Sequence, residues 1–216
     1  MAEQEIMQIL VVLDIVGTIA FALSGAMVAA QRGMDLFGIN VLGAVTATCG
    51  GIIRDLVIGS TPPAAFVHPR YVLLAVGVSN ITFLCLRKVR KAPAALKDFS
   101  ARMLFVFDTM GLAAFTMDGI ITGVNAGHGR NLFLICFLGV ITGVGGGIMR
   151  DILAGLMPTV FRKHVYALAS IAGGALTALL NYYQVSMSYA ILAGFFFIII
   201  IRIAASYFRW NLPRIE

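Results

Sequence analysis

The sequence predicts an all-α polytopic membrane protein with seven transmembrane helices, built from two inverted three-helix repeats and a seventh helix. Only 12% of the residues are charged and 60% are hydrophobic, whereas ordinary soluble domains carry about 25% charged residues. Continuous apolar runs of roughly 20 residues recur along the chain, which is the length needed to cross a hydrocarbon core. A membrane β-barrel would instead show alternating segments of about ten residues. A motif of paired glycines followed by Arg and Asp occurs twice, which predicts the repeats.

The apolar runs place the seven spans in order along one transmembrane domain that covers residues 1–216. No basic stretch precedes the first run, so we expect a retained first span rather than a cleaved signal peptide. Pro62 and Pro158 follow the second and fifth runs, where proline prevents a helix from continuing. We expect the spans at about residues 6–30, 36–58, 71–86, 103–122, 132–153, 165–183 and 188–208.

Lysine and arginine are distributed unequally between the two sides, which predicts the orientation. The loops on the side of the N-terminus carry Arg70 and Arg130. The other side carries many more basic residues: Arg32, the cluster from Arg87 to Arg102, Arg162, Lys163, Arg209 and Arg214. Basic loops stay in the cytoplasm, so we expect the N-terminus outside and the C-terminus in the cytoplasm.

An internal repeat relates the two halves of the chain. Residues 41–55 and 137–151 match at eight of fifteen positions, including both Arg-Asp pairs, and an earlier block pairs Asp14 with Asp108. These matches indicate a duplication, with repeat one at about residues 6–86 and repeat two at about residues 103–183. Three spans are an odd number, so the second copy enters the membrane upside down, as in many transport proteins. The seventh helix lies outside the repeats, and we expect it to serve packing or assembly.

The glycine-rich motifs predict that the second and fifth spans are broken inside the membrane. Carbonyl groups at the end of the half-helix before each break can replace part of a cation's hydration shell, and nearby threonine hydroxyls add further oxygens. The alternative is that such glycines are packing notches between helices, which we favour for Gly173, Gly174 and Gly194. The predicted pore-lining and ion-binding residues are Thr46, Thr48, Gly50, Gly51, Thr142, Gly145, Gly146 and Gly147.

Charged residues inside the apolar segments are candidates for gating or for structural support, because such residues are costly in a membrane. The candidates are Arg54, Asp55, Arg150, Asp151, Asp14 and Asp108. Neighbours in sequence point in different directions on a helix, so we expect Arg54 and Asp55 to pair poorly with each other. Each arginine either gates one mouth of the path, holds its helices together, or reaches the nearer interface. Asp14 and Asp108 attract cations, relay protons, or accept hydrogen bonds from the arginine of the other repeat. Asp118 aligns with Ser24, so the repeat does not require its charge.

Several functional classes are excluded by the residue pattern. An intramembrane aspartyl enzyme needs two carboxylates in contact, whereas the repeat places Asp14 and Asp108 toward opposite faces. We therefore expect no enzyme and no cofactor. Loop histidines and scattered cysteines predict neither a disulfide nor a metal site beyond the transported cation. No segment outside the membrane is large enough to bind nucleic acid. The loop histidines are His68, His128 and His164, and the scattered cysteines are Cys49, Cys85 and Cys136.

Two three-span repeats, each with a Gly-Gly-x-x-Arg-Asp element, and a seventh span resemble the bacterial relatives of the trimeric intracellular cation (TRIC) channels. The most specific parts run from Met34 to Asp55 and from Gly145 to Gly155. The resemblance implies a multi-pass protein of the bacterial inner membrane that forms a homotrimer surrounded by membrane lipid. It also implies one hourglass pore inside each protomer, lined by the second and fifth spans together with the first and fourth.

The resemblance implies conduction of monovalent cations, chiefly potassium. The leading hypothesis is therefore a passive potassium-permeable channel with a pore within each protomer. The same bacterial domain is also labelled a glycine transporter, so the alternative is a secondary transporter of a small zwitterion such as glycine. In that case the carboxylate of the substrate would lie on the backbone amides after each break.

Overall fold

The computed structural model describes residues 2–89, 95–162 and 165–210, and over these residues the chain is helical, without a strand. Seven of its helices are long and apolar enough to cross a membrane. These are α1 (Ala2–Gln31), α2 (Leu36–Val57), α4 (Arg70–Val89), α5 (Ala95–Gly123), α6 (Leu132–Leu153), α8 (Val165–Tyr182) and α9 (Met187–Tyr207). The predicted fold class, all-α with seven spans, is confirmed.

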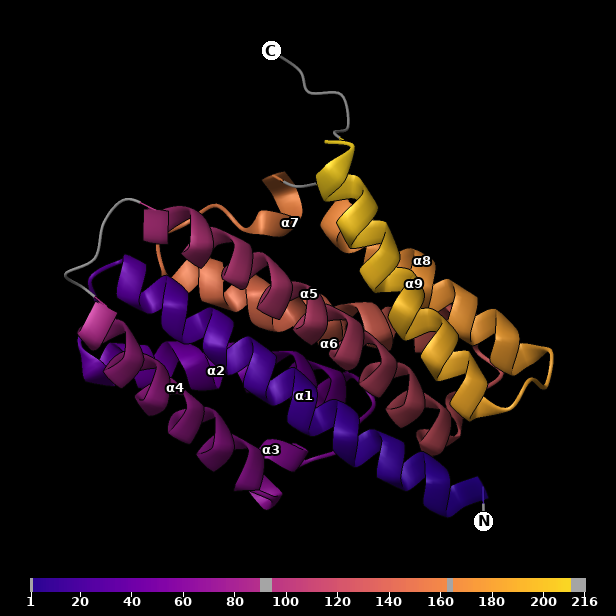
Figure 1. Ribbon diagram of the computed structural model, residues 1–216. Coiled ribbons are helices and arrows are strands. Elements are labelled where there is room, and N and C mark those ends of the chain that lie inside the picture. The colour runs from indigo at the N-terminus through magenta and orange to yellow at the C-terminus, as the bar shows by residue number, and fades with distance from the viewer. Residues whose placement is uncertain (1, 90–94, 163–164, 211–216) are drawn as a thin grey trace.

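Three short helical turns lie in segments that we expected to be loops. These are α3 (Ala64–Val67), the π-helical turn η1 (Val124–His128) and α7 (Thr159–Arg162). Successive spans run in opposite directions, so α3, η1 and the N-terminus share one end of the bundle, here called the α3 end. The opposite end, called the α7 end, holds α7 and the C-terminal end of α9 (Figure 1). The basic residues at positions 90–94, Lys163 and Arg214 lie outside the described residues.

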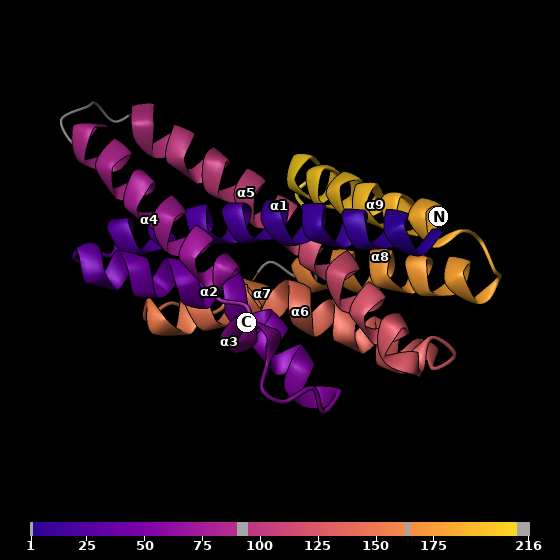
Figure 2. The same cartoon turned by 90° about the horizontal axis from the view of Figure 1, so that it is seen from below.

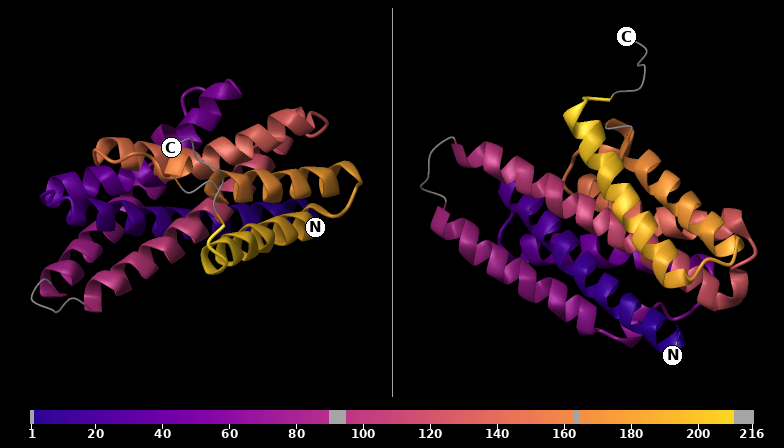
Figure 3. Two further views of the ribbon diagram at one scale, coloured as in Figure 1. Left: turned by 90° about the horizontal axis from the view of Figure 1, so that it is seen from above. Right: turned by 45° about the vertical axis from the view of Figure 1, so that its right-hand side comes forward.

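Four helices form the centre of the molecule: α1, α2, α5 and α6 pack against one another. Helix α4 packs on α1 and α2, while α8 and α9 lie together on the other flank, against α6 and α5 (Figures 1 and 2). The views in Figure 3 show the same arrangement from above and from the α9 side. Among the spans, α5 is the most enclosed, because its apolar side chains such as Leu112 and Ile120 are fully buried. Large apolar side chains face outward from the flanking helices instead, including Leu73, Ile81 and Ile200, as expected for contact with lipid.

The ends of α2 and α6 are built in the same way. Asp35 precedes α2, and its Oδ1 accepts a hydrogen bond from the amide of Gly38 at 2.8 Å. Asn131 caps α6 by accepting one from the amide of Leu134 at 3.0 Å. Both helices end at a glycine with positive φ (75° and 65°), a conformation that other residues rarely adopt. The sequence therefore specifies these helix ends locally; the glycines are Gly59 and Gly155.

Helices α2 and α6 run through their glycine-rich motifs without interruption, so the predicted breaks are wrong. The two helices cross there with their backbones in contact. Gly50 lies against the carbonyl oxygen of Thr142, and Gly146 lies against that of Thr46. A side chain at either glycine would overlap the facing carbonyl. Glycine costs a helix only about 1 kcal/mol relative to alanine, whereas an open break leaves backbone groups unpaired in lipid. The motifs are packing notches, as are Gly173 and Gly194, which face Ile198 and Thr177.

Candidate functional site

A buried cluster of charged residues, called the Arg54 cluster, lies at the α3 end and consists of Arg54, Asp55 and Asp118. Arg54 Nε donates to Asp55 Oδ1 at 2.9 Å, and its Nη1 forms an ion pair with Asp118 Oδ2. The second oxygen of Asp55 accepts the backbone amide of Ala64, the first residue of α3, at 2.9 Å. The cluster therefore joins α2 to α5 and fixes the turn that follows α2.

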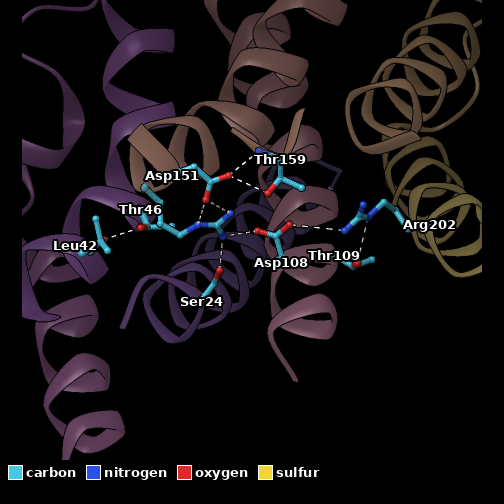
Figure 4. Close-up of polar contacts among 9 residues, drawn as sticks. Ser24, Leu42, Thr46, Asp108, Thr109, Asp151, Thr159 and Arg202 are labelled. Carbon is cyan, nitrogen blue, oxygen red and sulfur yellow. Dashed lines mark hydrogen bonds and ion pairs between the residues drawn. The ribbon is translucent and has the colours of Figure 1, made fainter. Parts of the chain in front are cut away.

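A matching cluster, called the Arg150 cluster, lies at the α7 end and consists of Arg150, Asp151, Asp108 and Ser24. Arg150 Nε donates to Asp151 Oδ1 at 2.8 Å, and its Nη1 donates to Asp108 Oδ1 at 2.6 Å and to Ser24 Oγ. Asp151 Oδ2 accepts both the amide and the hydroxyl of Thr159, at 2.7 and 2.8 Å. Figure 4 shows Ser24, Asp108, Asp151 and Thr159 converging from four different segments. Burial of this cluster is nearly complete, with Arg150 at 3% exposure.

The expectation that Arg54 and Asp55 pair poorly with each other is wrong, and the same contact occurs between Arg150 and Asp151. A buried guanidinium must satisfy five N–H donors away from water. The long side chain folds back along its helix to reach the neighbouring carboxylate and still extends Nη1 to another helix. Asp108 does pair with an arginine, but with the one in its own repeat rather than in the other.

Asp118, whose charge the repeat did not require, is the ionic partner of Arg54 across the two repeats. The signal in the sequence was the carboxylate inside an apolar run; the structure shows that Ser24, at the aligned position, bonds Arg150. Arg202 on α9 is a functional candidate that the sequence reasoning missed. It is 5% exposed, and its Nη2 lies 3.7 Å from Asp108 Oδ2. Its charge inside an apolar run was the signal that could have found it.

A cavity of about 160 Å³ opens beside the Arg54 cluster at the α3 end. Asp14 lines it and is half-buried, and no described residue forms an ion pair with it. Two of the predicted pore-lining residues, Thr48 and Gly51, also line this cavity, as do Arg54 and Asp55. His68 borders it as well, but among the described residues no three His, Cys, Asp or Glu side chains are placed to hold a metal ion.

The other predicted pore-lining residues do not border the cavity. Most lie where α2 and α6 touch, whereas Gly147 lies against Tyr166 of α8. The hydroxyl groups of Thr46 and Thr142 each donate to a backbone carbonyl one turn earlier, at Leu42 and Leu138, both at 2.6 Å; Figure 4 shows the first of these bonds. Gly50, Gly145, Gly146 and Gly147 are buried. In this arrangement the predicted oxygen ligands are engaged within their own helices.

Comparison with known proteins identifies the family. A family model described as "Glycine transporter" matches residues 11–87 and 105–182. The UPF0126 inner membrane protein YadS of Escherichia coli is 41% identical over 201 residues, which are 93% of this chain and 92% of that protein. A UPF0126 membrane protein of Bacillus subtilis, YvgT, is 35% identical over 93% of this chain and 94% of its own length.

Solved structures agree with this assignment. The TRIC trimeric intracellular cation channel orthologue from Rhodobacter sphaeroides superposes with a TM-score of 0.83 at 33% identity, over 93% of this chain and 98% of that one. A prokaryotic TRIC channel crystallised in 0.5 M KCl gives a TM-score of 0.81 at 30% identity, over 95% of this chain and the whole of the other. The resemblance expected from the repeated motifs is confirmed, and the chain, a multi-pass membrane protein, belongs to the family of the TRIC channels, which the glycine transporter model also describes.

Proposed function

We propose that this protein is a potassium-permeable channel for monovalent cations in the bacterial inner membrane, with a pore within each protomer. The observation that carries the proposal is its likeness, at 30–33% identity over more than nine-tenths of the chain, to three structures of TRIC channels. The E. coli relative is named an inner membrane protein, which supports the location. Ion conduction requires no enzymatic chemistry, and we propose none.

The cavity at the α3 end supports cation entry. It is lined by three acidic side chains, Asp14, Asp55 and Asp118, and by two arginines, Arg54 and Arg70. Charge of one sign inside low-dielectric walls concentrates counter-ions and speeds their entry. Two threonines, Thr18 and Thr48, also border the cavity. The cavity is therefore suited to receive a small cation that has lost part of its water.

The crossing of α2 and α6 closes the route beyond this cavity, because two backbones touch there. An ion passes only when the helices separate at the notches, and separation exposes the threonine hydroxyls that now bond within each helix. Under this proposal Thr46, Thr48, Thr142 and the glycines at 50, 51 and 145–147 line the open path. Arg54 and Arg150 hold the two ends closed through their ion pairs, because both pairs join different helices.

The inverted repeat and the assembly are part of the same proposal. Aligned residues make matching contacts at opposite ends of the bundle, and the family model matches two successive stretches. We place the N-terminus outside and the C-terminus in the cytoplasm, because most basic loop residues lie at the α7 end. Self-association as a homotrimer, with lipid around it, follows the trimeric TRIC orthologue.

The alternative function, secondary transport of a small zwitterion such as glycine, is favoured by the description of the family model. Purified protein in planar bilayers separates the two. A channel gives discrete unitary currents that reverse at the potassium equilibrium potential in a KCl gradient. Saturable glycine counterflow in liposomes without unitary currents would replace the channel proposal with the transporter.

A further inference from the structure

Arg202 places a positive charge from the seventh helix inside the bundle. It is 5% exposed, and its Nε donates to Thr109 Oγ1 at 3.3 Å. Its Nη2 lies 3.7 Å from Asp108 Oδ2, and its Cζ lies 4.6 Å from the ring centroid of Tyr166. Figure 4 shows this side chain pointing from α9 toward Asp108 and Thr109. A second ring, that of Phe105, has its centroid 4.8 Å from the same Cζ, so one guanidinium contacts a carboxylate, a hydroxyl and two aromatic faces.

The two ends of the bundle differ at this point. At the α3 end, Asp14, Tyr71 and Arg54 border the open cavity of about 160 Å³. At the α7 end, residues of the same three types, Asp108, Tyr166 and Arg150, are buried, and Arg202 lies against the first two. The guanidinium of Arg202 thus occupies, at the α7 end, a position next to the same residue types that line an open cavity at the α3 end.

The hydroxyl group of Tyr166 indicates that this position has a second possible occupant. The side chain is 2% exposed, and its Oη is buried without a hydrogen-bond partner. It lies against Gly147, 3.1 Å from where a Cβ of that residue would be. Arg202 contacts the face of the ring and leaves the oxygen unused. An unsatisfied buried hydroxyl is costly, and a hydroxyl oxygen is a group that can coordinate a monovalent cation.

Charge balance restricts how Arg202 can leave. Asp108 and Asp151 are balanced by Arg150 and Arg202 in a site with almost no solvent exposure. Removing one partner from a buried ionic group is strongly unfavourable because it leaves an uncompensated charge. The departure of Arg202 is therefore least costly when another cation takes its place.

We propose that Asp108, Thr109 and Tyr166 form a monovalent-cation site at the α7 end, and that Arg202 is a tethered cation that occupies it. Withdrawal of α9 frees the site for a permeating ion, and the return of Arg202 displaces that ion. The inference rests on the proposed channel function, but cation binding at the site can be measured without any current.

The binding test compares wild type with Arg202→Met, Arg202→Lys and the double variant Arg202→Met/Asp108→Asn. The melting temperature of each detergent-solubilised protein is measured in KCl and in choline chloride at equal ionic strength. A ligand that binds the folded state raises the melting temperature. We expect potassium to stabilise Arg202→Met but neither wild type nor Arg202→Lys, and we expect the double variant to lose the effect. Arg32→Met is the matched control, because Arg32 lies near the same end and its side chain donates to the carbonyl of Ala154, away from Asp108.

The current test uses the same proteins in planar bilayers. We expect a higher open fraction for Arg202→Met and wild-type behaviour for Arg202→Lys and Arg32→Met. If Arg202→Met folds and its melting temperature is the same in KCl and in choline chloride, the inference is overturned, even if wild type conducts. Conversely, potassium binding that depends on Asp108 in a protein without currents supports the site and refutes the channel. If Arg202→Met does not fold, Arg202→Gln replaces it; if neither folds, the guanidinium is a structural requirement and the inference fails.

Discussion

Ser24 and Asp118 occupy aligned positions in the two repeats, and each accepts a bond from the arginine of the opposite repeat. Arg150 donates to Ser24, and Arg54 donates to Asp118. The same contact is therefore made twice, once with a neutral hydroxyl and once with a carboxylate. Where Ser24 lacks a charge, Asp108 supplies one to Arg150. Each arginine is thus paired with two carboxylates. The second carboxylate comes from Asp118 for Arg54 and from Asp108 for Arg150.

This difference predicts unequal costs for removing the two cross-repeat contacts. Asp118→Asn takes a charge from a buried ion pair, which we expect to destabilise the protein by about 3 kcal/mol. Ser24→Ala removes one hydrogen bond to a charged group, which costs roughly 1.5 kcal/mol. Reversible unfolding in mixed micelles measures both values. Equal losses would show that the charge of Asp118 contributes nothing to stability.

The α2–α6 crossing predicts that Gly50→Ala disturbs the closed arrangement. A Cβ at position 50 overlaps the carbonyl of Thr142, and overpacking costs about 1–3 kcal/mol. Because the strain disappears when the helices separate, we expect a higher open fraction in bilayers. Gly77→Ala is the control, since nothing lies within 4 Å of a Cβ built there. If both variants conduct like wild type, the crossing is not the barrier.

The cavity predicts that Asp14→Asn lowers potassium conductance. Losing this carboxylate weakens the attraction of cations to the α3 end, by up to about tenfold at low ionic strength. The loss should shrink as salt screens the cavity. Asp35→Asn is the control, because Asp35 caps α2 outside the cavity and asparagine caps equally well. Conductance measured from low to high KCl tests this, and a loss that does not vary with salt would argue against attraction by charge.

The contact between Asp151 and Thr159 predicts a difference between the two short helices. Thr159→Ala removes the hydroxyl that Asp151 Oδ2 accepts at 2.8 Å, at a cost of about 1.5 kcal/mol. At the α3 end the matching oxygen, Asp55 Oδ2, accepts the amide of Ala64 and no hydroxyl of the described residues, so Ala64→Ser can add the missing donor. We expect the first change to lower the melting temperature and the second to leave it equal or raise it. A fall after Ala64→Ser would mean that the two ends differ in more than this hydroxyl.

Much of the fold follows from local features of the sequence. Apolar length and the flanking glycines and prolines delimit the spans, and the fifth was expected at residues 132–153, where α6 lies. These signals depend on hydrophobic transfer and on backbone conformation within a few residues, so they need no knowledge of neighbours. The repeated Arg-Asp motif likewise identified the arginine of each cluster and its neighbouring carboxylate.

The tertiary structure decided what those residues do. A glycine pair can interrupt a helix or admit another backbone, and only the facing helix distinguishes the two; here the carbonyls of Thr142 and Thr46 occupy the space. The partners of Arg54 and Arg150 lie 64 and 126 residues away, at Asp118 and Ser24, and no local pattern specifies such a pairing. Arg202 shows the same limit, because its contact with Asp108 exists only when α9 packs on α5. The backbone hydrogen bonds of a helix form within its own segment. A buried charge also needs ionic or hydrogen-bond partners, and these come from distant residues that only the folded chain places beside it.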